Sequence, residues 1–417
     1  MTNHQLGVKE ELRFCMKRTN VINLSKWLGE YVTIEKCLAV ERKHIMKIAF
    51  NALGLNPGHN GGAESVFLNL VKGFAVNMFK DDLVFFCYPK MSELIKSIYP
   101  DSTCVVVSLQ GKENLSRFEM LKIQSFYFHK IYREYDFDVI LFANPDVGIF
   151  SYSVPTVVIP HDIQYVSRPE INRNRIQFYR NYFSYRVPFR IVDKIVCISD
   201  IDKREIENCY PFTNKKTVKI YDPIDISNDS IRIKADKDNY ILAVNIQYPH
   251  KNIETLIRAF ALISSKFPNL TLKLVGANNE YTKSLEGLAE SLSIRDKVEF
   301  MGFISKELLD DLWSSAKLYV NPSLYEGFGM TSVESILHGA PTLLSDIEVN
   351  HEVTEGLCEF FDDIQNPQSL SAAIERMLEM DYNVLKSKEK AEVLVQKYCL
   401  ENISKQYLNL LSDMVAQ

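Results

Sequence analysis

The chain of 417 residues is longer than one ordinary domain, and two domains of roughly 100–200 residues each are expected. Hydrophobic residues make up 46% and charged residues 24% of the sequence, which is typical of a globular protein and excludes wholesale disorder. The formal net charge of −5 predicts no nucleic-acid partner, because duplex binding needs a concentrated basic surface.

The eight cysteines are scattered, without a CxxC pair or metal-ligand spacing. Several, such as Cys87 and Cys197, lie in apolar runs and are expected to be buried free thiols in a reducing compartment. No apolar run approaches the ~18–20 residues of a membrane span, and residues 1–45 lack the pattern of a signal peptide. These features predict a cytoplasmic protein, with peripheral attachment to the inner face of the membrane as an open alternative.

The first 45 residues show no ordered alternation of strand and helix. We expect 1–45 to be an extension outside the core, or the product of a start codon assigned too early. From Met46 the character changes: MKIAFNAL reads as a short apolar strand, a glycine-bearing loop follows, and an amphipathic helix begins at Ala63.

Short apolar runs then alternate with helical stretches. In the first half the expected strands are LVFFCY (83–88), CVVVSL (104–109), DVILFA (138–143), TVVIP (156–160), KIVCIS (194–199) and TVKIY (217–221). Continuous runs rich in Val and Ile are typical of strands that are covered on both faces. The helices between them favour an α/β fold with a doubly wound parallel sheet, in a first domain at 46–225.

A polar stretch with little periodicity follows, and we place the linker between domains at 226–239. The second set of expected strands is YILAVN (240–245), TLKLVG (271–276), KVEFMG (297–302), LYVNPS (318–323) and PTLLSD (341–346). They define a second domain at 240–382, and helices at 383–417 are expected to pack back toward the first domain. Two such halves predict a cleft between facing strand ends, where ligands of these sheets usually bind.

The segment NPSLYEGFGMTSVESILHGAPTLLSD (321–346) carries the richest chemistry. A strand is expected to end at Ser323, a loop with two glycines follows, and a helix begins near Met330. Glycines let the backbone approach a ligand, and the first free amides of the helix form an anion site. Glu326 and Glu334 can reach two ends of one ligand, and carboxylates accept paired hydrogen bonds from vicinal hydroxyls.

The run EGFGMTSVE resembles the Glu-x7-Glu motif of the retaining glycosyltransferases of family four, which have the GT-B architecture of two Rossmann-like domains facing a cleft. The segments SLYEGFG, HGAPTLLSD and NHEV (350–353) fit the same family in order, and the resemblance extends from about Met46 to the C-terminus. It implies that Glu326 lies by the donor sugar and that Glu334 binds the ribose hydroxyls. The loop between them is expected to contact the donor through Gly327, Phe328, Gly329, Met330 and Thr331.

The segment NIQYPHKNIETLIRAF (245–260) places Lys251 just before a helix whose expected N-cap is Asn252. A cation at a helix N-terminus suits a diphosphate, and the family resemblance assigns Lys251 to the donor diphosphate. Many relatives carry an Arg five residues earlier, where this chain has Ile246, and others carry an Arg directly before the Lys. His250 occupies that second position and is the candidate for the second phosphate contact.

In IPHDIQYVSRPE (159–170), His161 and Asp162 follow an expected strand and should project into the cleft. The pair resembles the His-Asp of a subgroup of family four, which implies that His161 lies beside the donor sugar. A lone histidine is usually structural, but its place at a strand end favours function. Together with the PHKN loop, this pair favours the mannosyl-like branch of the family.

Two further segments resemble parts of the cleft in this family. NPGHNGGAES (56–65) is similar to the N-terminal glycine loop that approaches the donor phosphates and the acceptor, although Gly61 and Gly62 would also fit a plain tight turn. It is not a dinucleotide fingerprint, because GxGxxG is missing. Ser199 and Lys203 match the start of another helix at the cleft.

The stretch 172–190 concentrates five arginines among aromatic residues. A solvated amphipathic helix is the simpler interpretation. The alternative is a basic, aromatic face for an anionic acceptor or for a lipid headgroup surface.

The resemblance implies retaining transfer of a sugar from a nucleotide-diphosphate-sugar to a hydroxyl of a glycan or lipid-linked acceptor, in polysaccharide biosynthesis, with no cofactor and no metal. The Asp-x-Asp at 136–138 opens an expected strand and so lies at the wrong end for the cleft. A nucleotide-sugar epimerase or a phosphorylase on the same fold is one alternative. A non-catalytic sugar-nucleotide-binding protein is another, which the presence of Glu326, Glu334 and Lys251 disfavours.

Overall fold

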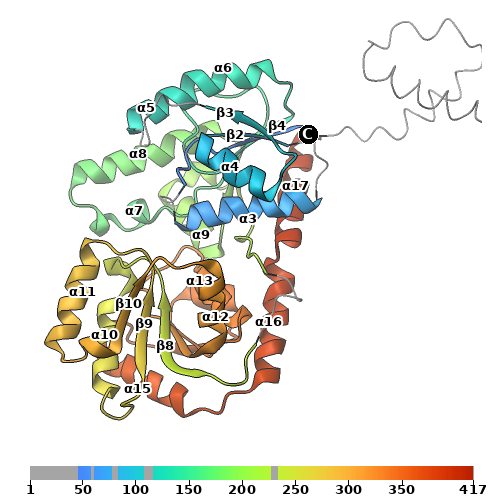
Figure 1. Cartoon of the computed structure of the whole chain (residues 1–417). Helices are drawn as coiled ribbons and strands as arrows, with labels where there is room; N and C mark the ends of the chain where they lie inside the picture. Colours follow the sequence, from blue (N-terminus) through green and yellow to red (C-terminus); the bar gives the residue numbers. More distant parts are fainter. Residues whose placement is uncertain (1–45, 58–60, 78–82, 108–115, 227–232, 417) are drawn as a thin grey trace, which may run out of the picture. The chain divides into compact units, whose positions relative to one another are not determined.

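The first sheet has seven parallel strands in the order β3-β2-β1-β4-β5-β6-β7 (Figure 1). In this computed structural model the described residues are 46–416, except for 58–60, 78–82, 108–115 and 227–232, so the extension predicted for 1–45 lies outside them. The strands are β1 (Ile48–Asn51), β2 (Leu83–Cys87), β3 (Thr103–Val106), β4 (Val139–Phe142), β5 (Thr156–Val158), β6 (Lys194–Cys197) and β7 (Thr217–Lys219). Each of them falls on a predicted apolar run.

Two hydrophobic cores cover the two faces of this sheet. Its helices and turns are α3 (Gly62–Asn77), α4 (Pro89–Ile98), α5 (Arg117–Lys122), η1 (Ile123–Phe128), α6 (His129–Ile131), η2 (Tyr132–Glu134), α7 (Gln164–Ser167), η3 (Pro169–Ile171), α8 (Arg175–Ile191), α9 (Asp200–Cys209) and η4 (Pro211–Thr213). Successive strand residues point to opposite faces, so Phe85 packs with the α3 residue Phe67 while Phe86 packs with Phe128. Burial on both faces explains why the strands read as continuous apolar runs.

The second sheet has six parallel strands in the order β10-β9-β8-β11-β12-β13. They are β8 (Asp238–Val244), β9 (Thr271–Val275), β10 (Val298–Gly302), β11 (Ala316–Asn321), β12 (Thr342–Ser345) and β13 (Glu359–Phe361). β8 begins inside the segment expected to be linker, and β11 ends at Asn321 rather than at Ser323. β13 was not predicted, because three residues that begin with a glutamate give no apolar run.

Helices pack on both faces of this sheet too. They are η6 (Pro249–Lys251), α10 (Ile253–Ile263), α11 (Glu280–Ser291), η7 (Arg295–Lys297), α12 (Lys306–Ser315), α13 (Met330–Leu337), α14 (Glu348–Thr354) and α15 (Pro367–Glu379). Apolar positions of α10 such as Leu256 and Phe260 recur at helical spacing and are buried against Leu272 and Ile374. On the other face Trp313 packs edge-on against Tyr319.

The chain ends in α16 (Val384–Tyr398) and α17 (Leu400–Val415). α16 packs on α13, and α17 packs on α3. The contact with α3 requires a glycine, since a Cβ on Gly73 would lie 2.7 Å from the Leu400 carbonyl oxygen and 2.8 Å from the Ser404 Cβ. The junction of the two helices also bridges the chain that leaves the first sheet, through Ile224 and Cys399. The C-terminal helices thereby connect the two sheets.

Candidate functional site

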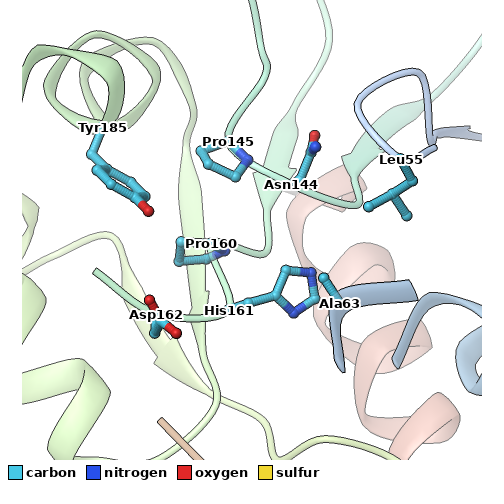
Figure 2. Close-up of a pocket in the computed structure, with 8 residues that line it drawn as sticks. All are labelled: Leu55, Ala63, Asn144, Pro145, Pro160, His161, Asp162 and Tyr185. Atoms are coloured by element: carbon cyan, nitrogen blue, oxygen red, sulfur yellow. The ribbon is translucent and has the colours of Figure 1, made fainter. Parts of the chain in front are cut away.

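A pocket of about 250 Å³ opens at the carboxyl ends of β4 and β5 (Figure 2). It is lined by Leu55, Ala63, Asn144, Pro145, Pro160, His161, Asp162 and Tyr185. The loops after β1, β4 and β5 supply most of this lining, and Tyr185 reaches in from α8. The predicted His161-Asp162 pair therefore does border a pocket at the strand ends, as expected for ligand sites of α/β sheets.

His161 is held in a strained backbone conformation with one ring nitrogen committed. Its φ of 65° lies in the left-handed region, which costs a non-glycine residue of order 1 kcal/mol or more. The Nε2 atom lies 2.8 Å from the Ala143 carbonyl oxygen, and because a carbonyl can only accept, Nε2 must carry the proton. Burial lowers the pKa of His161 to about 4. The imidazole is therefore neutral near pH 7, and because its Nδ1 atom makes no hydrogen bond within the described part of the chain, it can accept one from a ligand hydroxyl.

Asp162 stands beside His161 and against the glycine loop of the second sheet. Burial raises the pKa of the Asp162 carboxyl, although the Gln164 amide and Lys251 favour its charged form. A Cβ on Gly327 would lie 3.1 Å from the His161 carbonyl oxygen and 3.2 Å from the Asp162 Cβ. This spacing is tighter than side chains normally tolerate, so glycine is what lets the two loops meet.

Glu326 and Lys251 form the charged centre of the site. The Lys251 Nζ lies 2.7 and 2.8 Å from the two Glu326 carboxylate oxygens. Ser323 Oγ also donates to Glu326 Oε1 at 2.8 Å. Burial opposes ionisation, but Lys251 and these hydrogen bonds outweigh it, so the pKa of Glu326 is lowered. We expected Glu326 at the donor sugar and Lys251 at the diphosphate, and in the structure the two side chains are in direct contact.

Lys251 is the last residue of the η6 turn, which leads into α10. Asn252 is the N-cap, as predicted, but its φ is 55° and its side chain makes no capping hydrogen bond. Its Nδ2 atom donates instead to the carbonyl oxygens of Pro322 at 3.1 Å and Ile364 at 2.7 Å. Asn252 therefore anchors the Lys251 turn to the loop that follows β11.

His250 lies in a column of rings beside this charged pair. Its imidazole centroid is 5.9 Å from that of Tyr248 and 5.0 Å from that of Tyr325. Burial and the neighbouring Lys251 lower the pKa of His250 to about 4. The ring is therefore uncharged near pH 7, so the predicted contact of His250 with the second phosphate would be a hydrogen bond from a neutral imidazole.

Arg168 is a site residue that sequence reasoning missed. Its guanidinium carbon lies 4.2 Å from the centroid of the Tyr325 ring, and it forms an ion pair with Glu205 at 2.9 Å. Arg168 follows α7, on the same loop as His161, whereas Tyr325 belongs to the second sheet. No periodicity or motif in IPHDIQYVSRPE marks it, since its partner is distant in the chain.

The loop from Gly327 leads into a helix near Met330, as predicted, but the side chain of Phe328 does not face a donor. Gly329 has φ 82° and is the N-cap of α13, so the helix begins at Met330. Thr331 Oγ1 accepts a hydrogen bond from Tyr319 at 3.0 Å. The Phe328 ring is buried against Tyr398, with centroids 5.3 Å apart. Its side chain therefore anchors the loop to α16, and only its backbone can face a donor.

Glu334 lies one turn into α13 in a different environment from Glu326. Burial raises the pKa of Glu334 to about 7, with Asp310 and Asp225 adding to this effect and Lys306 opposing it. Among the hydrogen bonds of the described residues, none involves its carboxylate oxygens. The Glu334 carboxylate oxygens can therefore accept hydrogen bonds from a ligand, as the predicted contact with ribose hydroxyls requires.

Ser199 and the N-terminal glycines lie at the same junction. Ser199 Oγ caps α9 by accepting from the Asp202 amide at 3.0 Å, and it donates to the Gly327 carbonyl oxygen at 2.8 Å. Gly61 has φ 52° and precedes the first residue of α3, Gly62. A Cβ on Gly61 would approach the Ile246 side chain at 3.7 Å, and one on Gly62 would meet nothing within 4 Å. Ser199 thus holds the Gly327 loop in place. The position of a Cβ on Gly62 is open space.

Within the described ranges, no group of three or more His, Cys, Asp or Glu side chains is arranged to hold a metal ion. Asp138 of the Asp-x-Asp lies at the amino end of β4, where its carboxylate accepts the Lys47 amide at 2.8 Å. That edge of the sheet is opposite to the pocket. No helix in the described part of the chain is long and apolar enough to span a membrane.

Two parallel sheets with facing loops at their carboxyl ends define the GT-B class, and solved structures of that class match the chain. Sucrose-phosphate synthase from Thermosynechococcus elongatus has a TM-score of 0.71 at 19% identity, covering 89% of this chain and 99% of that one. Anabaena Alr3699/HepE in complex with UDP and glucose has a TM-score of 0.67 at 18% identity, covering 88% and 100%. WaaG, a glycosyltransferase involved in lipopolysaccharide biosynthesis, has 0.64 at 15%, covering 87% and 99%.

Family models match both halves of the chain. Residues 60–228 match the model for Glycosyltransferase Family 4, and residues 226–396 match that for Glycosyl transferases group 1. The chain therefore belongs to the family-four glycosyltransferases. This bears out the resemblance carried by EGFGMTSVE and its neighbouring motifs.

Among curated relatives, the O-antigen chain mannosyltransferase RfbU of Salmonella typhimurium is 33% identical over 184 residues, which are 42% of this chain and 51% of that protein. The serotype-specific mannosyltransferase WbdA of Escherichia coli is 31% identical over 228 residues, which are 50% of this chain and 27% of that protein. The match thus spans about half the length of these relatives or less.

Proposed function

We propose that the protein transfers a sugar, with retention of anomeric configuration, from a nucleotide-diphosphate-sugar to a hydroxyl of a glycan or lipid-linked acceptor. The observation that carries this proposal is the Lys251–Glu326 pair, held at 2.7 Å beside the amino end of α13. It combines a cation and free helix amides for a diphosphate with a carboxylate for a sugar. Across the loop contact at Gly327, His161 offers a neutral acceptor nitrogen.

Departure of the nucleotide diphosphate is the step that most needs stabilisation in such a reaction. Lys251 and the amides around Gly329 to Thr331 would meet the charge that develops on the leaving phosphate. These groups supply the role that a divalent cation fills elsewhere, and we therefore infer a metal-independent reaction. Lys251 would exchange part of its contact with Glu326 for the phosphate, because both compete for the same ammonium.

We infer front-face attack, in which the acceptor hydroxyl bonds to the anomeric carbon, the bond to the leaving phosphate oxygen breaks, and the hydroxyl proton passes to that oxygen. Glu326 is ionised, so it can stabilise positive charge on the sugar and orient it. Lys251 and Ser323 hydrogen-bond to the Glu326 carboxylate, and the contacts that remain when Lys251 also binds the phosphate lower its nucleophilicity and disfavour a covalent glycosyl-enzyme. The neutral His161 ring accepts from a sugar hydroxyl and keeps the donor in register.

We propose a mannosyl donor and an acceptor in the assembly of a surface polysaccharide. Two relatives, RfbU and WbdA, are named as mannosyltransferases, and RfbU acts on the O-antigen chain by its name. The cysteines of the described residues are free thiols, which supports a reducing, cytoplasmic site of action.

A panel of nucleotide sugars tests this proposal. A donor present at a free concentration of about 100 times its dissociation constant adds about 2.7 kcal/mol to the free energy of unfolding. This stabilisation is readily measured as a rise in melting temperature. The donor that stabilises the protein is then incubated with a lipid-linked acceptor, and the anomeric configuration of the product is read by NMR.

Each alternative has its own outcome in this panel. Isomerised sugar formed from donor alone identifies an epimerase, and turnover that needs only inorganic phosphate identifies a phosphorylase. Stabilisation by a donor with no turnover under any condition identifies a binding protein. Inversion at the anomeric carbon would contradict the retaining mechanism.

A further inference from the structure

Helix α8 (Arg175–Ile191) has apolar residues on two opposite faces. The inner face packs on the first sheet, where Phe178, Tyr182, Tyr185 and Phe189 join its hydrophobic core. Tyr182 stacks on Tyr210 with ring centroids 5.0 Å apart, and Tyr185 lines the pocket beside His161 (Figure 2). A helix that packs in this way normally turns a polar face to water.

The outer face of α8 instead exposes large apolar side chains. Ile176 is 81% exposed, Tyr179 is 57% exposed and Phe183 is 53% exposed. Their spacing of three, four and seven residues puts them on one side of the helix, opposite Tyr185. Apolar residues gathered on one exposed face are the mark of an interaction surface, whereas single exposed ones need no explanation.

Positive charge surrounds this apolar stripe. Arginines occupy positions 173, 175, 180, 186 and 190, and no Asp or Glu occurs from residue 171 to residue 192. Arg175 and Arg180 are exposed, and neither takes part in an ion pair among the described residues. The chain as a whole has a net charge of −5, so this segment is a local reversal of sign.

We propose that the outer face of α8 (Ile176, Tyr179 and Phe183 with Arg175 and Arg180) binds an anionic membrane surface. The apolar side chains would enter the boundary between headgroups and acyl chains, and the arginines would pair with lipid phosphates. A nucleic acid would pair its phosphates with the arginines but would leave Ile176 and Phe183 without an apolar partner. The pattern therefore fits a lipid surface better than a polar polyanion.

This inference deepens the proposed function. Only the suggested use of membrane binding, which is to reach a lipid-linked acceptor, rests on that function. Tyr185 lines the pocket from the inner face of α8, so the outer face lies about one helix diameter, ~10 Å, from the pocket. A membrane held there would present a lipid-linked acceptor close to the donor site. Binding to the membrane itself requires neither donor nor turnover.

Vesicle flotation with the full-length protein tests the proposal. Vesicles that contain about one third phosphatidylglycerol are compared with vesicles of pure phosphatidylcholine. We expect the protein to float with the anionic vesicles only, and high salt to weaken binding. Arg175→Gln with Arg180→Gln should weaken binding about 25-fold, at about 5-fold for each arginine. Ile176→Ser with Phe183→Ser should weaken it at least about 10-fold.

A matched control lies on α16, where Leu385 is 72% exposed beside the exposed Lys386. Leu385→Ser with Lys386→Gln should leave flotation unchanged. Unchanged melting temperatures show that the variants are folded, since all the altered side chains lie in solvent.

Absence of vesicle binding, equal binding to both lipids, or equal losses in the control and α8 variants would overturn the proposal. So would binding to heparin or oligonucleotides without binding to vesicles. The donor-induced rise in melting temperature is measured without vesicles, so failure of the catalytic proposal is scored separately.

Discussion

Glu326 and Glu334 belong to one sequence motif but occupy opposite electrostatic environments. Lys251 and two hydrogen bonds lower the pKa of Glu326, whereas burial raises the pKa of Glu334 to about 7. Both side chains are only partly exposed, so the difference arises mainly from their partners. One carboxylate is thus ready to meet positive charge on a sugar, and the other lacks a partner until a ligand brings hydroxyls.

Replacement of Lys251 tests its assignment to the diphosphate. Each charge-assisted hydrogen bond contributes roughly 1.5–3 kcal/mol, so Lys251→Ala should reduce the rate of donor turnover on the order of 10–100-fold. The variant also leaves Glu326 without its cation, which should raise the pKa of that carboxyl and move the acid limb of the pH–rate profile upward. Lys251→Arg should recover part of the rate. Lys283→Ala, on the exposed surface of α11, is the control, and undiminished turnover by Lys251→Ala would remove the assignment.

Glu334 should make stability depend on pH. Its folded-state pKa of about 7 lies above the unfolded value near 4.5, so the folded state binds more protons between these values. Stability from this group is greatest below about pH 4.5 and is lost as the pH rises to about 7. Glu334→Gln should therefore raise the free energy of unfolding at pH 8 by on the order of 3 kcal/mol, which raises the melting temperature, and should change both little at pH 4.5. The same variant should bind donor more weakly. A melting temperature that falls at pH 8 would contradict this account.

At the scale of elements, most of the site comes from the loops that follow strands, and α13 and α8 add Glu334 and Tyr185. The loop with Gly327 follows β11, the η6 turn precedes α10, and the loop with His161 follows β5. Asn252 ties the second of these loops to the first, and Ser199 ties α9 to the Gly327 carbonyl. Rigid strands therefore position flexible loop residues to within hydrogen-bonding distance, which is how α/β folds generally build their sites.

Gly327 is the element-scale position where one added methyl group should matter most. A Cβ there would press on the His161 carbonyl oxygen at 3.1 Å, and the loop would have to shift. We expect Gly327→Ala to lower turnover at least about 10-fold and to destabilise the fold by about 1–3 kcal/mol. Gly287→Ala in α11, where a Cβ meets nothing within 4 Å, should stabilise the protein by about 0.5–1 kcal/mol. Full activity of Gly327→Ala would show that the loops do not meet during the reaction.

For the whole molecule, the contacts between the two sheets combine packing and charge. Phe328 packs on Tyr221, the Asp200 amide donates to Glu352 at 2.8 Å, and the Arg168 guanidinium lies over the Tyr325 ring. The last contact adjoins Glu326 directly in sequence. Together with the hydrogen bond from Ser199 to the Gly327 carbonyl oxygen, it is therefore a contact through which the first sheet can set the position of the Glu326 loop.

Arg168 should act as a positioning residue. Loss of a partly buried cation–π contact costs about 1 kcal/mol, so Arg168→Ala should raise the donor KM about 5-fold with a smaller effect on kcat. Arg168→Lys keeps a cation over the ring and should restore part of the KM. Steady-state kinetics with varied donor make this measurement. Equal effects of the two substitutions, or a loss confined to kcat, would indicate a different role.

The sequence predicted the regular elements well because their signals are local. All strands from β1 to β12 fall on predicted apolar runs, and Asn383 begins the helical C-terminus as expected. Errors came where a short element lacks such a signal, as at β13, or where an end is set by neighbours. β11 ends early because the Asn321 side chain hydrogen-bonds to Ser323 in the following loop and to Ser332 in α13.

The sequence by itself determined the alternation of strands and helices, the family, and the identity of the charged residues that we propose for the donor site. Each of these depends on spacing along the chain, such as the two glutamates around one loop and helix start. Only the tertiary structure decided that Lys251 pairs with Glu326, that His250 is an uncharged ring, that Phe328 is a core anchor and that Arg168 reaches Tyr325. Charge state, burial and contact depend on groups that come from distant segments, and no local pattern encodes which groups those are.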